Sequence, residues 1–385
     1  MTKDLLPYFK DRTQNIIDLL TEMVNYESFS TDKPAVDKLA VFMAEKCRAF
    51  GAESVEILPQ VEVGDFVLAK WNSGAQGKPI LILGHIDTVW KPGTLAERPV
   101  TITGDGILFG PGALDMKAGN TIALSAIHGL IERGEMPERP IWVLFNSDEE
   151  IGSHASTPII ESLAAQAGLV LIMEPGTPDG ALKTQRKGIA TYRLHITGRA
   201  SHAGNFPEQG INAIIEAAQQ AVSLNKLNDL RNGTSVSVTM IDGGSAGNVI
   251  PDRASIYIDT RTITIQAAQR IDKAIGDLQP QVPGAKIELE RIHQRPPMEH
   301  NAVMQASFAQ AKTIGAEYGL TIREESVGGG SDGNTTAAMG IPTLDGLGAI
   351  GDGLHALHEQ LLISSLAERT TLCAAIIKEW AFSGN

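Results

Sequence analysis

Three continuous apolar runs limit the folds available to this chain. They are PILILGHI (79–86), PIWVLFN (140–146) and GLVLIME (168–174), and each ends in, or is soon followed by, histidine or acids. A strand that is apolar at nearly every position is buried on both faces, as strands of parallel sheets are. Helical patterns separate the runs, for example residues 117–133 with Gly134 at their end. The alternation predicts an α/β domain with a mainly parallel sheet flanked by helices.

The pattern changes after about residue 186. The expected elements are then a strand at 189–198, a helix at 209–224, strands at 234–244 and 254–262, a helix at 266–278 and a strand at 285–293. The order β-α-β-β-α-β is that of a ferredoxin-like unit. After about residue 297 the chain returns to helix and buried strand. We therefore expect one α/β domain interrupted by an inserted α+β domain.

Composition excludes several classes of function. The chain has 385 residues, and its formal net charge of −13 leaves no basic surplus for binding nucleic acid. Two cysteines, Cys47 and Cys373, are too few for a disulfide framework or a thiolate metal cage. No run approaches the roughly 18 apolar residues of a membrane span, and the N-terminus is not a secretory signal. A cytoplasmic protein is expected.

Polar residues follow the three apolar runs. His85 and Asp87 follow the first, Glu149 and Glu150 the second, and Glu174 ends the third. Functional groups gather at the carboxyl ends of strands in such sheets. Imidazole and carboxylate ligands without cysteine suit zinc, or cobalt or manganese. A simpler alternative for the adjacent acids is a solvated turn.

Simpler structural roles also fit some of these residues. If the strand persists, His85 and Asp87 face the same side, so Asp87 can accept the free ring N–H of His85. Alternatively, His85 only closes the strand and Asp87 caps the next turn. Asp115, in the glycine-rich stretch GPGALDMKAGN (110–120), precedes a helix, where an N-cap is the simpler explanation.

Together, these pieces resemble the aminoacylase/carboxypeptidase-G family of di-zinc metallopeptidases, and within it the glutamate carboxypeptidase-like branch. The resemblance covers nearly the whole chain and is carried, in family order, by GHIDTVW, GPGALDMKAGN, NSDEEIGS, LIMEPG, GRASHAG, AGNVIPDRA and GDGLHALHE. It implies a zinc-exopeptidase-like catalytic domain formed by residues 1–187 and 297–385. Residues 188–296 would form an inserted ferredoxin-like lid and dimerisation domain.

The resemblance also implies the metal ligands. Asp115 would bridge two zinc ions, with cobalt or manganese as alternatives. His85 and Glu174 would complete the protein ligands of the first ion, and Glu150 and His355 those of the second.

The same motifs imply the remaining roles in the catalytic domain. Glu149 would be the general base, and Asp87 would orient His85. In HALHE, His355 matches the family's ligand and Glu359 the acid four residues later, whereas His358 is expected at the rim. Asp148 receives no role.

Substrate-binding residues are expected mainly in the inserted domain. By resemblance, His202, delivered from the second subunit of a homodimer, would stabilise the oxyanion, and Asn248 would assist it. The alternative for His202 is an ordinary loop histidine. Arg295 and Arg261 could bind a free substrate carboxylate, with Ser331 adding a hydroxyl. The alternative for Arg261 is an ion pair that stabilises the domain.

The sequence thus predicts a di-zinc hydrolase that cleaves an amide bond next to a free carboxylate, in a small peptide or N-acyl amino acid. Carboxypeptidase activity that releases C-terminal glutamate is the leading expectation. The alternatives are an aminopeptidase or tripeptidase, an N-acyl-amino-acid deacylase and, from a different class, a catalytically silent binding module.

Overall fold

The computed structural model describes residues 4–382, and its chain divides into two compact units. The second unit comprises Gln185–Glu299 with Gly328–Gly330, and the first unit comprises the rest of the described chain. The inserted unit thus begins at 185 rather than 188 and ends at 299 rather than 296. The short glycine segment that joins it was not expected.

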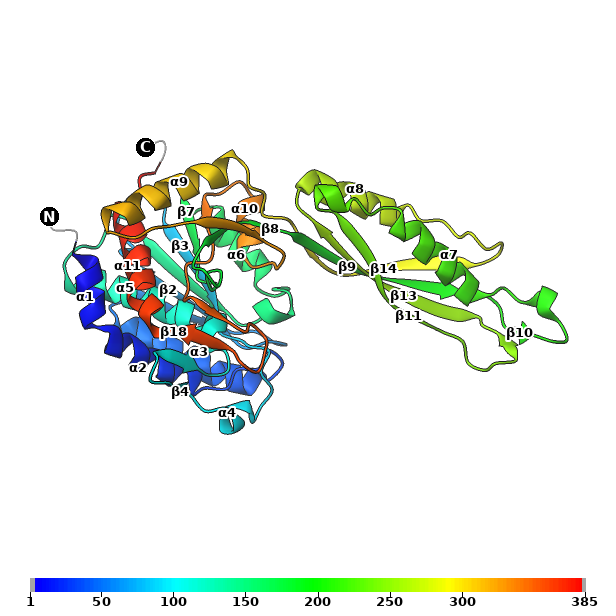
Figure 1. Cartoon of the computed structure of the whole chain (residues 1–385), viewed down its shortest axis with the longest axis horizontal. Coiled ribbons are helices and arrows are strands. Elements are labelled where there is room, and N and C mark those ends of the chain that lie inside the picture. Colours follow the sequence, from blue (N-terminus) through cyan, green and yellow to red (C-terminus); the bar gives the residue numbers. More distant parts are fainter. Residues whose placement is uncertain (1–3, 383–385) are drawn as a thin grey trace. The chain divides into compact units, whose positions relative to one another are not determined.

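A six-stranded sheet forms the centre of the first unit (Figure 1), in the order β1-β2-β6-β3-β7-β16. Its strands are β1 (Ser54–Leu58), β2 (Phe66–Trp71), β6 (Ile141–Asn146), β3 (Ile80–His85), β7 (Leu169–Ile172) and β16 (Thr343–Leu344). β3 runs parallel to β6 and β7, and β7 runs parallel to β16, whereas β1 and β2 are antiparallel to their neighbours. The predicted mainly parallel sheet is confirmed.

Successive residues of β3 pack into two separate hydrophobic cores. Ile80 and Ile82 pack into a core on one face, and Leu81 and Leu83 pack into a core on the other. Helices that cover the first face are α1 (Leu5–Asp11), α2 (Thr13–Val24), α3 (Lys33–Ala49), α5 (Ala118–Glu132), α9 (Ala302–Glu317) and α11 (Ile363–Glu379). Those on the second face are α6 (Thr157–Ala164) and α10 (Gly333–Ala338). Burial on both faces explains why the strand is apolar throughout.

Apolar residues recur at helical spacing through residues 4–25, a pattern that predicts one helix, but the segment forms two. α1 ends at Asp11 and α2 begins at Thr13. The Thr13 hydroxyl donates to the carbonyl of Lys10 at 2.9 Å. A threonine hydroxyl that bonds to nearby backbone competes with the regular helix, which accounts for the break.

Smaller sheets shape the rim of the first unit. β17 (Gly351–Asp352), β18 (Gln360–Leu362), β5 (Ile107–Phe109) and β4 (Thr101–Ile102) form one of them in that order, and α4 (Thr94–Glu97) lies before β4 in the chain. β8 (Leu182–Arg186) pairs with β15 (Glu324–Val327). Because β18 pairs with β5, the chain before β18 is brought beside the chain that follows β5. No helix within residues 4–382 has the length and apolar character that a bilayer crossing needs.

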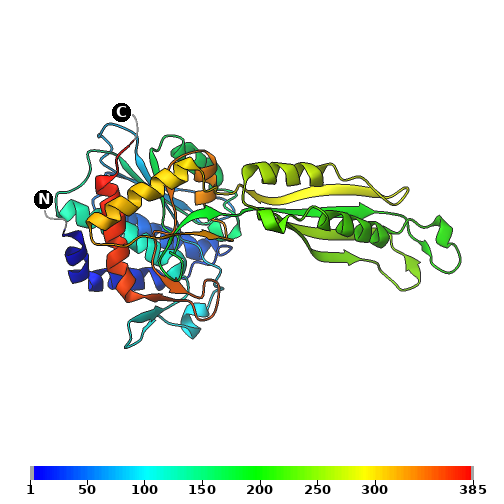
Figure 2. The same cartoon turned by 45° about the horizontal axis from the view of Figure 1, so that its top comes forward.

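The second unit has the predicted ferredoxin-like order. Its antiparallel sheet has the order β11-β13-β9-β14. The elements along the chain are β9 (Gly188–Thr197), α7 (Ala213–Asn225), β11 (Ser235–Gly243), β13 (Arg253–Thr262), α8 (Ile265–Gly276) and β14 (Lys286–Arg295). Figures 1 and 2 show both helices on one face of the sheet, where one apolar core lies. Residues of β13 alternate in burial, as expected for a sheet with one covered face.

Candidate active site

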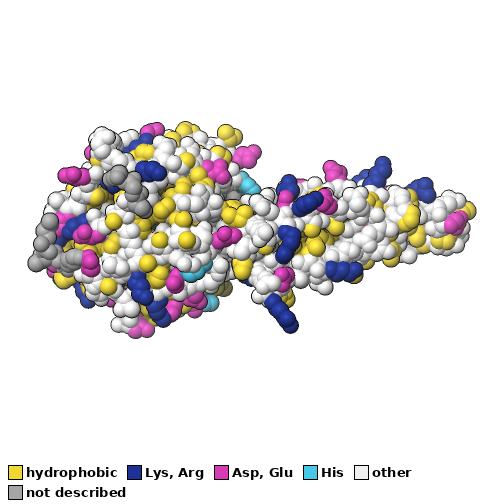
Figure 3. Space-filling model, turned by 90° about the horizontal axis from the view of Figure 1, so that it is seen from above, with side chains coloured by type: hydrophobic (Ala, Val, Ile, Leu, Met, Phe, Trp, Pro, Cys, Tyr) yellow, Lys and Arg dark blue, Asp and Glu magenta, His cyan; other side chains and the backbone are white. Residues whose placement is uncertain are grey.

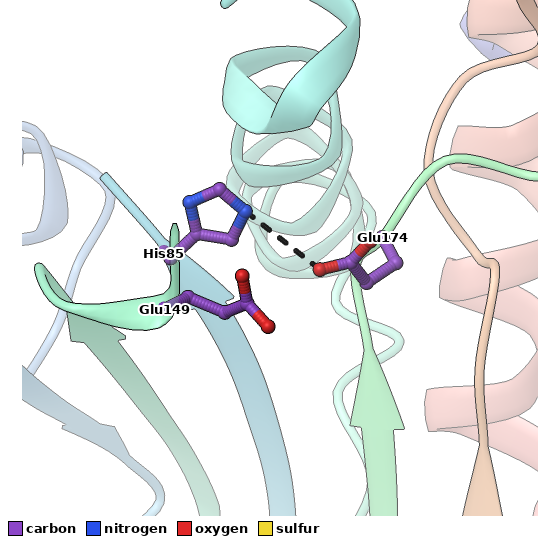
Figure 4. Close-up of side chains that lie close together, drawn as sticks. All are labelled: His85, Glu149 and Glu174. Carbon is purple, nitrogen blue, oxygen red and sulfur yellow. Dashed lines mark ion pairs between the residues drawn. The ribbon is translucent and has the colours of Figure 1, made fainter. Parts of the chain in front are cut away.

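Side chains from three strand ends meet at the carboxyl edge of the central sheet. His85 is the last residue of β3, Glu149 lies just beyond β6, and Glu174 lies just beyond β7. Figure 4 shows these three side chains converging, with Nε2 of His85 at 3.7 Å from Oε1 of Glu174. Their ligand atoms lie within 4.8 Å of one another. The structure thus brings together side chains that lie far apart in the sequence.

Asp115 divides its carboxylate between two histidines. Its Oδ1 lies 3.3 Å from Nε2 of His85, and its Oδ2 lies 3.2 Å from Nε2 of His355. Glu150 approaches the same His355 nitrogen at 3.1 Å. Two groups result, one with His85 and Glu174 and the other with His355 and Glu150, and Asp115 belongs to both.

Glycines allow the backbone near Asp115 to adopt its path. Gly112 has a φ of +70°, a left-handed conformation that side chains rarely allow, and a Cβ there would lie 2.5 Å from Thr88. Gly119, at the start of α5, lies so close to β7 that a Cβ would be 1.8 Å from the Met173 carbonyl oxygen. This close packing keeps the Asp115 segment beside the strand end that carries Glu174.

His355 comes from the loop between β17 and β18. Its φ is +59°, and 54% of its side chain is exposed. A non-glycine residue in this region costs about 1–3 kcal/mol and persists only where its surroundings impose it. The loop therefore holds a strained backbone that directs the imidazole toward Asp115 and Glu150.

Asp87 supports the site in a way that differs in part from the expectation. Nδ1 of His85 lies 3.0 Å from the backbone carbonyl oxygen of Asp87 and 3.4 Å from its carboxylate. The nearer acceptor for the ring N–H is thus the main chain. The carboxylate accepts from the backbone N–H groups of Glu149 and Glu150, each at 3.3 Å. Asp87 therefore orients His85 and also fixes the loop that carries both glutamates.

Mutual electrostatics shift the pKa values of these groups. Burial alone would lower the pKa of His85, but the carboxylates of Asp115 and Asp87 raise it well above its usual value. Asp115 and Glu150 raise the pKa of His355 to about 10. Burial would raise the pKa of Asp115, but the two imidazoles lower it. Burial, aided by Asp115, raises the pKa of Glu150 to about 7 despite the opposing effect of His355.

The donor set fits divalent metal ions. Among the described residues, Nε2 of His85 and Oε1 of Glu150 are buried without a hydrogen-bond partner. Buried polar atoms rarely stay unsatisfied, and cations turn neighbouring carboxylates from repulsive into favourable partners. The ring N–H of His85 faces Asp87, so Nε2 is the atom directed into the cluster. The two groups that share Asp115 match two adjoining metal positions.

His202 and Asn248 lie next to each other in the second unit. His202 belongs to β10 (Ser201–His202), which pairs with β12 (Val249–Ile250), and Asn248 directly precedes β12. The carbonyl of Asn248 accepts from the N–H of Ala203 at 2.9 Å. The pairing brings both predicted oxyanion groups to one two-stranded sheet, although 45 residues separate them in the chain.

The remaining predicted substrate contacts differ in their surroundings. Arg261 pairs with Asp259 through two contacts of 2.9 and 3.1 Å, which matches the ion-pair alternative. Arg295 is buried at the end of β14 beside Gly330. Ser331 is buried in the first unit and donates to Asp345 at 2.5 Å. Its hydroxyl is thus engaged within the protein.

Two residues near the site received no role from the sequence. Glu359 accepts hydrogen bonds from the segment that contains Asp115. Asp148 accepts from the backbone N–H groups of Ala155 and Ser156, just before α6. For Glu359, the only available signal in the sequence was its position four residues after His355. For Asp148, it was the run of three acids at 148–150.

Comparisons with known proteins show the family to which the chain belongs. The family model described as Peptidase family M20/M25/M40 matches residues 81–379. Carboxypeptidase G2 of Pseudomonas sp. (strain RS-16) is 30% identical over 382 residues, covering 96% of this chain and 90% of that protein. Acetylornithine deacetylase of Myxococcus xanthus is 27% identical over 273 residues, covering 66% and 69%.

A solved structure shows the same fold. The crystal structure of aminopeptidase PepT from Bacillus cereus ATCC 10987 superposes with a TM-score of 0.76 at 22% identity, covering 95% of this chain and 98% of that one. The resemblance expected from the sequence motifs is therefore confirmed. The chain belongs to peptidase family M20/M25/M40 and is a metallo-hydrolase.

Proposed function

We propose that this enzyme uses two metal ions to hydrolyse an amide bond next to a free carboxylate, as a carboxypeptidase that releases C-terminal glutamate. The observation that carries the proposal is the Asp115 carboxylate, whose two oxygens face two different histidines. The similarity to carboxypeptidase G2 over 96% of the chain favours this substrate class.

Five side chains would hold the ions. His85, Asp115 and Glu174 would bind one ion, and Asp115, Glu150 and His355 the other. Zinc suits this set of nitrogen and oxygen donors, and cobalt or manganese can replace it. When bound, two such ions lower the pKa of a water molecule and polarise a carbonyl oxygen.

Glu149 would serve as the general base. It lies in a group with His85 and Glu174, whereas Glu150 lies in a group with His85 and Asp115. The Glu149 carboxylate would take a proton from the attacking water and pass it to the leaving amine nitrogen. Asp87 would keep Glu149 in place through its backbone N–H.

His202 has a hydrogen-bonding pattern that suits an oxyanion donor. Its Nδ1 accepts from the backbone N–H groups of Gly204 and Asn205, each at 3.1 Å. Nδ1 therefore carries no proton in this geometry, and the ring proton lies on Nε2. An exposed Nε2–H can donate to the oxygen on which charge develops during hydrolysis. Asn248, which directly precedes the partner strand β12, would supply a second donor.

For the substrate carboxylate we favour Arg295 over Arg261. Asp259 already neutralises Arg261 through a two-point contact. A guanidinium binds a carboxylate in a two-point geometry, so Arg295 would read the free carboxylate of the released amino acid. A hydroxyl contribution from Ser331 would require its bond to Asp345 to open.

The second unit offers a surface for a homodimer. Ile215 and Val222 on α7 and Met240 and Ile241 on β11 are 49%, 62%, 54% and 52% exposed. β11 is an edge strand of its sheet, and an exposed apolar edge strand readily pairs with another chain. Figure 3 shows exposed hydrophobic side chains among charged ones on this unit. We propose that two copies associate here.

A hydrolysis screen tests the proposed activity. Metal-loaded enzyme would be offered peptides and folate-like amides that end in glutamate, matched peptides that end in other residues, N-acetyl amino acids, and di- and tripeptides with a blocked carboxylate. Release of C-terminal glutamate with a kcat/KM above that of the other classes is expected. A requirement for a free amino terminus would replace the proposal with an aminopeptidase.

The similarity to acetylornithine deacetylase favours one second candidate, an N-acyl-amino-acid deacylase. A deacylase would use the same site and bind the same free carboxylate. Its substrate would differ only in the acyl group on the amide nitrogen. Preference for small acyl groups in the screen would select it.

A further inference from the structure

Glu359 is a buried carboxylate that lies beside the metal ligands without belonging to either ligand group. It is fully buried and accepts four hydrogen bonds. Its Oε2 accepts from Gly112 N at 2.8 Å and from the indole of Trp90 at 2.7 Å. Its Oε1 accepts from the N–H groups of Leu114 and Asp115 at 2.9 and 3.1 Å.

Burying an ionised carboxylate costs free energy unless hydrogen-bond donors compensate its charge. Asp115 also repels the Glu359 carboxylate. Among the described residues, four donors face it, which is the arrangement an acceptor-only carboxylate needs. A glutamine could accept through one oxygen only, and its NH2 group would face N–H groups. The ionised carboxylate is therefore needed to satisfy all four donors.

The four donors come from segments that supply metal ligands. Trp90 follows β3, the strand that ends in His85. Gly112–Asp115 is the backbone that carries Asp115, and Glu359 itself closes the loop that carries the strained His355. These contacts span 269 residues for Trp90 and 244 residues for Asp115. One carboxylate thus ties together three ligand-bearing segments that lie far apart in the chain.

We infer that Glu359 is a positioning residue that holds Asp115 between the two metal positions and keeps His355 aligned with it. The inference rests on the two-metal site proposed above. The second metal position depends on it most, because Asp115 and His355 both belong to segments that Glu359 fixes. The first position keeps His85 and Glu174, which the central sheet holds at the ends of β3 and β7.

The test compares Glu359→Gln with a matched control, Glu216→Gln. Glu216 is likewise fully buried and accepts from the N–H groups of Gln281 and Val282 and from the Gln220 amide, but it lies in the second unit. Both changes remove one charged acceptor from a buried network. Metal-free full-length proteins would be titrated with Co²⁺ against a chromophoric chelator, with thermal unfolding followed in parallel.

Glu359→Gln is expected to weaken the second Co²⁺ equivalent about tenfold to a hundredfold, as loss of an outer partner of a ligand does. The first equivalent should weaken less than the second, because His85 and Glu174 still hold it. The whole Glu216→Gln titration should match the wild type, although both variants lose thermal stability. A second-equivalent affinity equal to that of the wild type would overturn the inference. So would equal weakening of both equivalents, since that is the result of a merely structural role.

A second variant covers the case in which Glu359→Gln does not fold. Glu359→Asp keeps the charge but draws it back from the four donors, so the second equivalent should again bind more weakly than in the wild type. Wild-type affinity in that variant would refute the positioning role. A wild-type protein that binds fewer than two Co²⁺ ions would instead refute the proposed function, whichever variant is used.

Discussion

Glu149 and Glu150 are neighbours in the chain with different surroundings. Oε2 of Glu150 lies 3.1 Å from His355, and its Oε1 is buried without a hydrogen-bond partner among the described residues. Glu149 instead lies in the group with His85 and Glu174. Two adjacent carboxylates can hardly both bind one ion without crowding. We therefore propose Glu150 as a metal ligand and Glu149 as the general base.

Replacing Glu149 should therefore abolish turnover without loss of metal. Glu149→Ala is expected to lower kcat by about 10²–10⁴-fold, the range of general-base catalysis, while metal content stays near that of the wild type. Glu150→Ala is the matched variant and should lose one metal equivalent. Steady-state kinetics and elemental analysis of the same samples check both. Loss of a full equivalent from Glu149→Ala would mean that the two roles are exchanged.

Protons and metal ions should compete for the site. The pKa of His355 is raised to about 10 and that of His85 is raised as well, so both imidazoles hold a proton in the metal-free protein near neutral pH. Metal binding must displace them, with release of roughly two protons per pair of ions. Affinity should rise with pH, and below about pH 7 protonation of Glu150 weakens it further.

Calorimetry in buffers of different ionisation enthalpy measures this release. His355→Ala should release fewer protons than the wild type, since one displaced proton is missing. Metal affinity that does not change between pH 6 and pH 9 would contradict the protonation states described here.

Among the helices and strands, those with a clear local pattern of apolar residues could be predicted from the sequence. Apolar residues at nearly every position identified β3, β6 and β7, because burial on both faces favours apolar side chains. The candidate ligands His85, Glu150 and Glu174 were chosen from their positions at or after the ends of those strands, and Asp115 and His355 from the motifs alone. The break between α1 and α2 was missed, because the bond of the Thr13 hydroxyl to the Lys10 carbonyl competes with a helical pattern that is otherwise continuous.

Contacts between distant segments could not be predicted in this way. The pairing of β18 with β5 joins two three-residue strands, too short to show a pattern. The role of Glu359 depends on that pairing, since its donors lie 244 or more residues away. The engagement of Ser331 by Asp345 likewise depends on tertiary packing.

His202 lies on β10, which pairs with β12, and its proposed role as an oxyanion donor can be tested across subunits. His202→Ala should lower kcat by about 10²–10³-fold, as loss of one oxyanion donor does, with unchanged metal content. If the partner subunit supplies His202, mixing the His202→Ala and Glu149→Ala proteins should restore part of the activity. One site of each mixed dimer then has both residues. A mixture no more active than its components would place His202 in the site of its own chain or outside any site.

At the scale of the whole molecule, the proposed dimer rests on the exposed apolar residues of α7 and β11. Val222→Glu puts a charge into that surface and should shift the protein toward monomer in light scattering after gel filtration. Val61, 93% exposed in the first unit, offers the control Val61→Glu, which should leave the oligomeric state unchanged. A Val222→Glu protein that stays dimeric would place the interface elsewhere.

Two metal ions that share Asp115 in a hydrolytic site are central to the proposed function. The most direct test is to titrate metal-free enzyme with Zn²⁺ or Co²⁺ while following hydrolysis of an amide that ends in glutamate. We predict that two equivalents bind per chain and that hydrolysis returns as the second equivalent is filled. A protein that binds no stoichiometric metal and hydrolyses no amide under these conditions would contradict the account and indicate a catalytically silent binding protein.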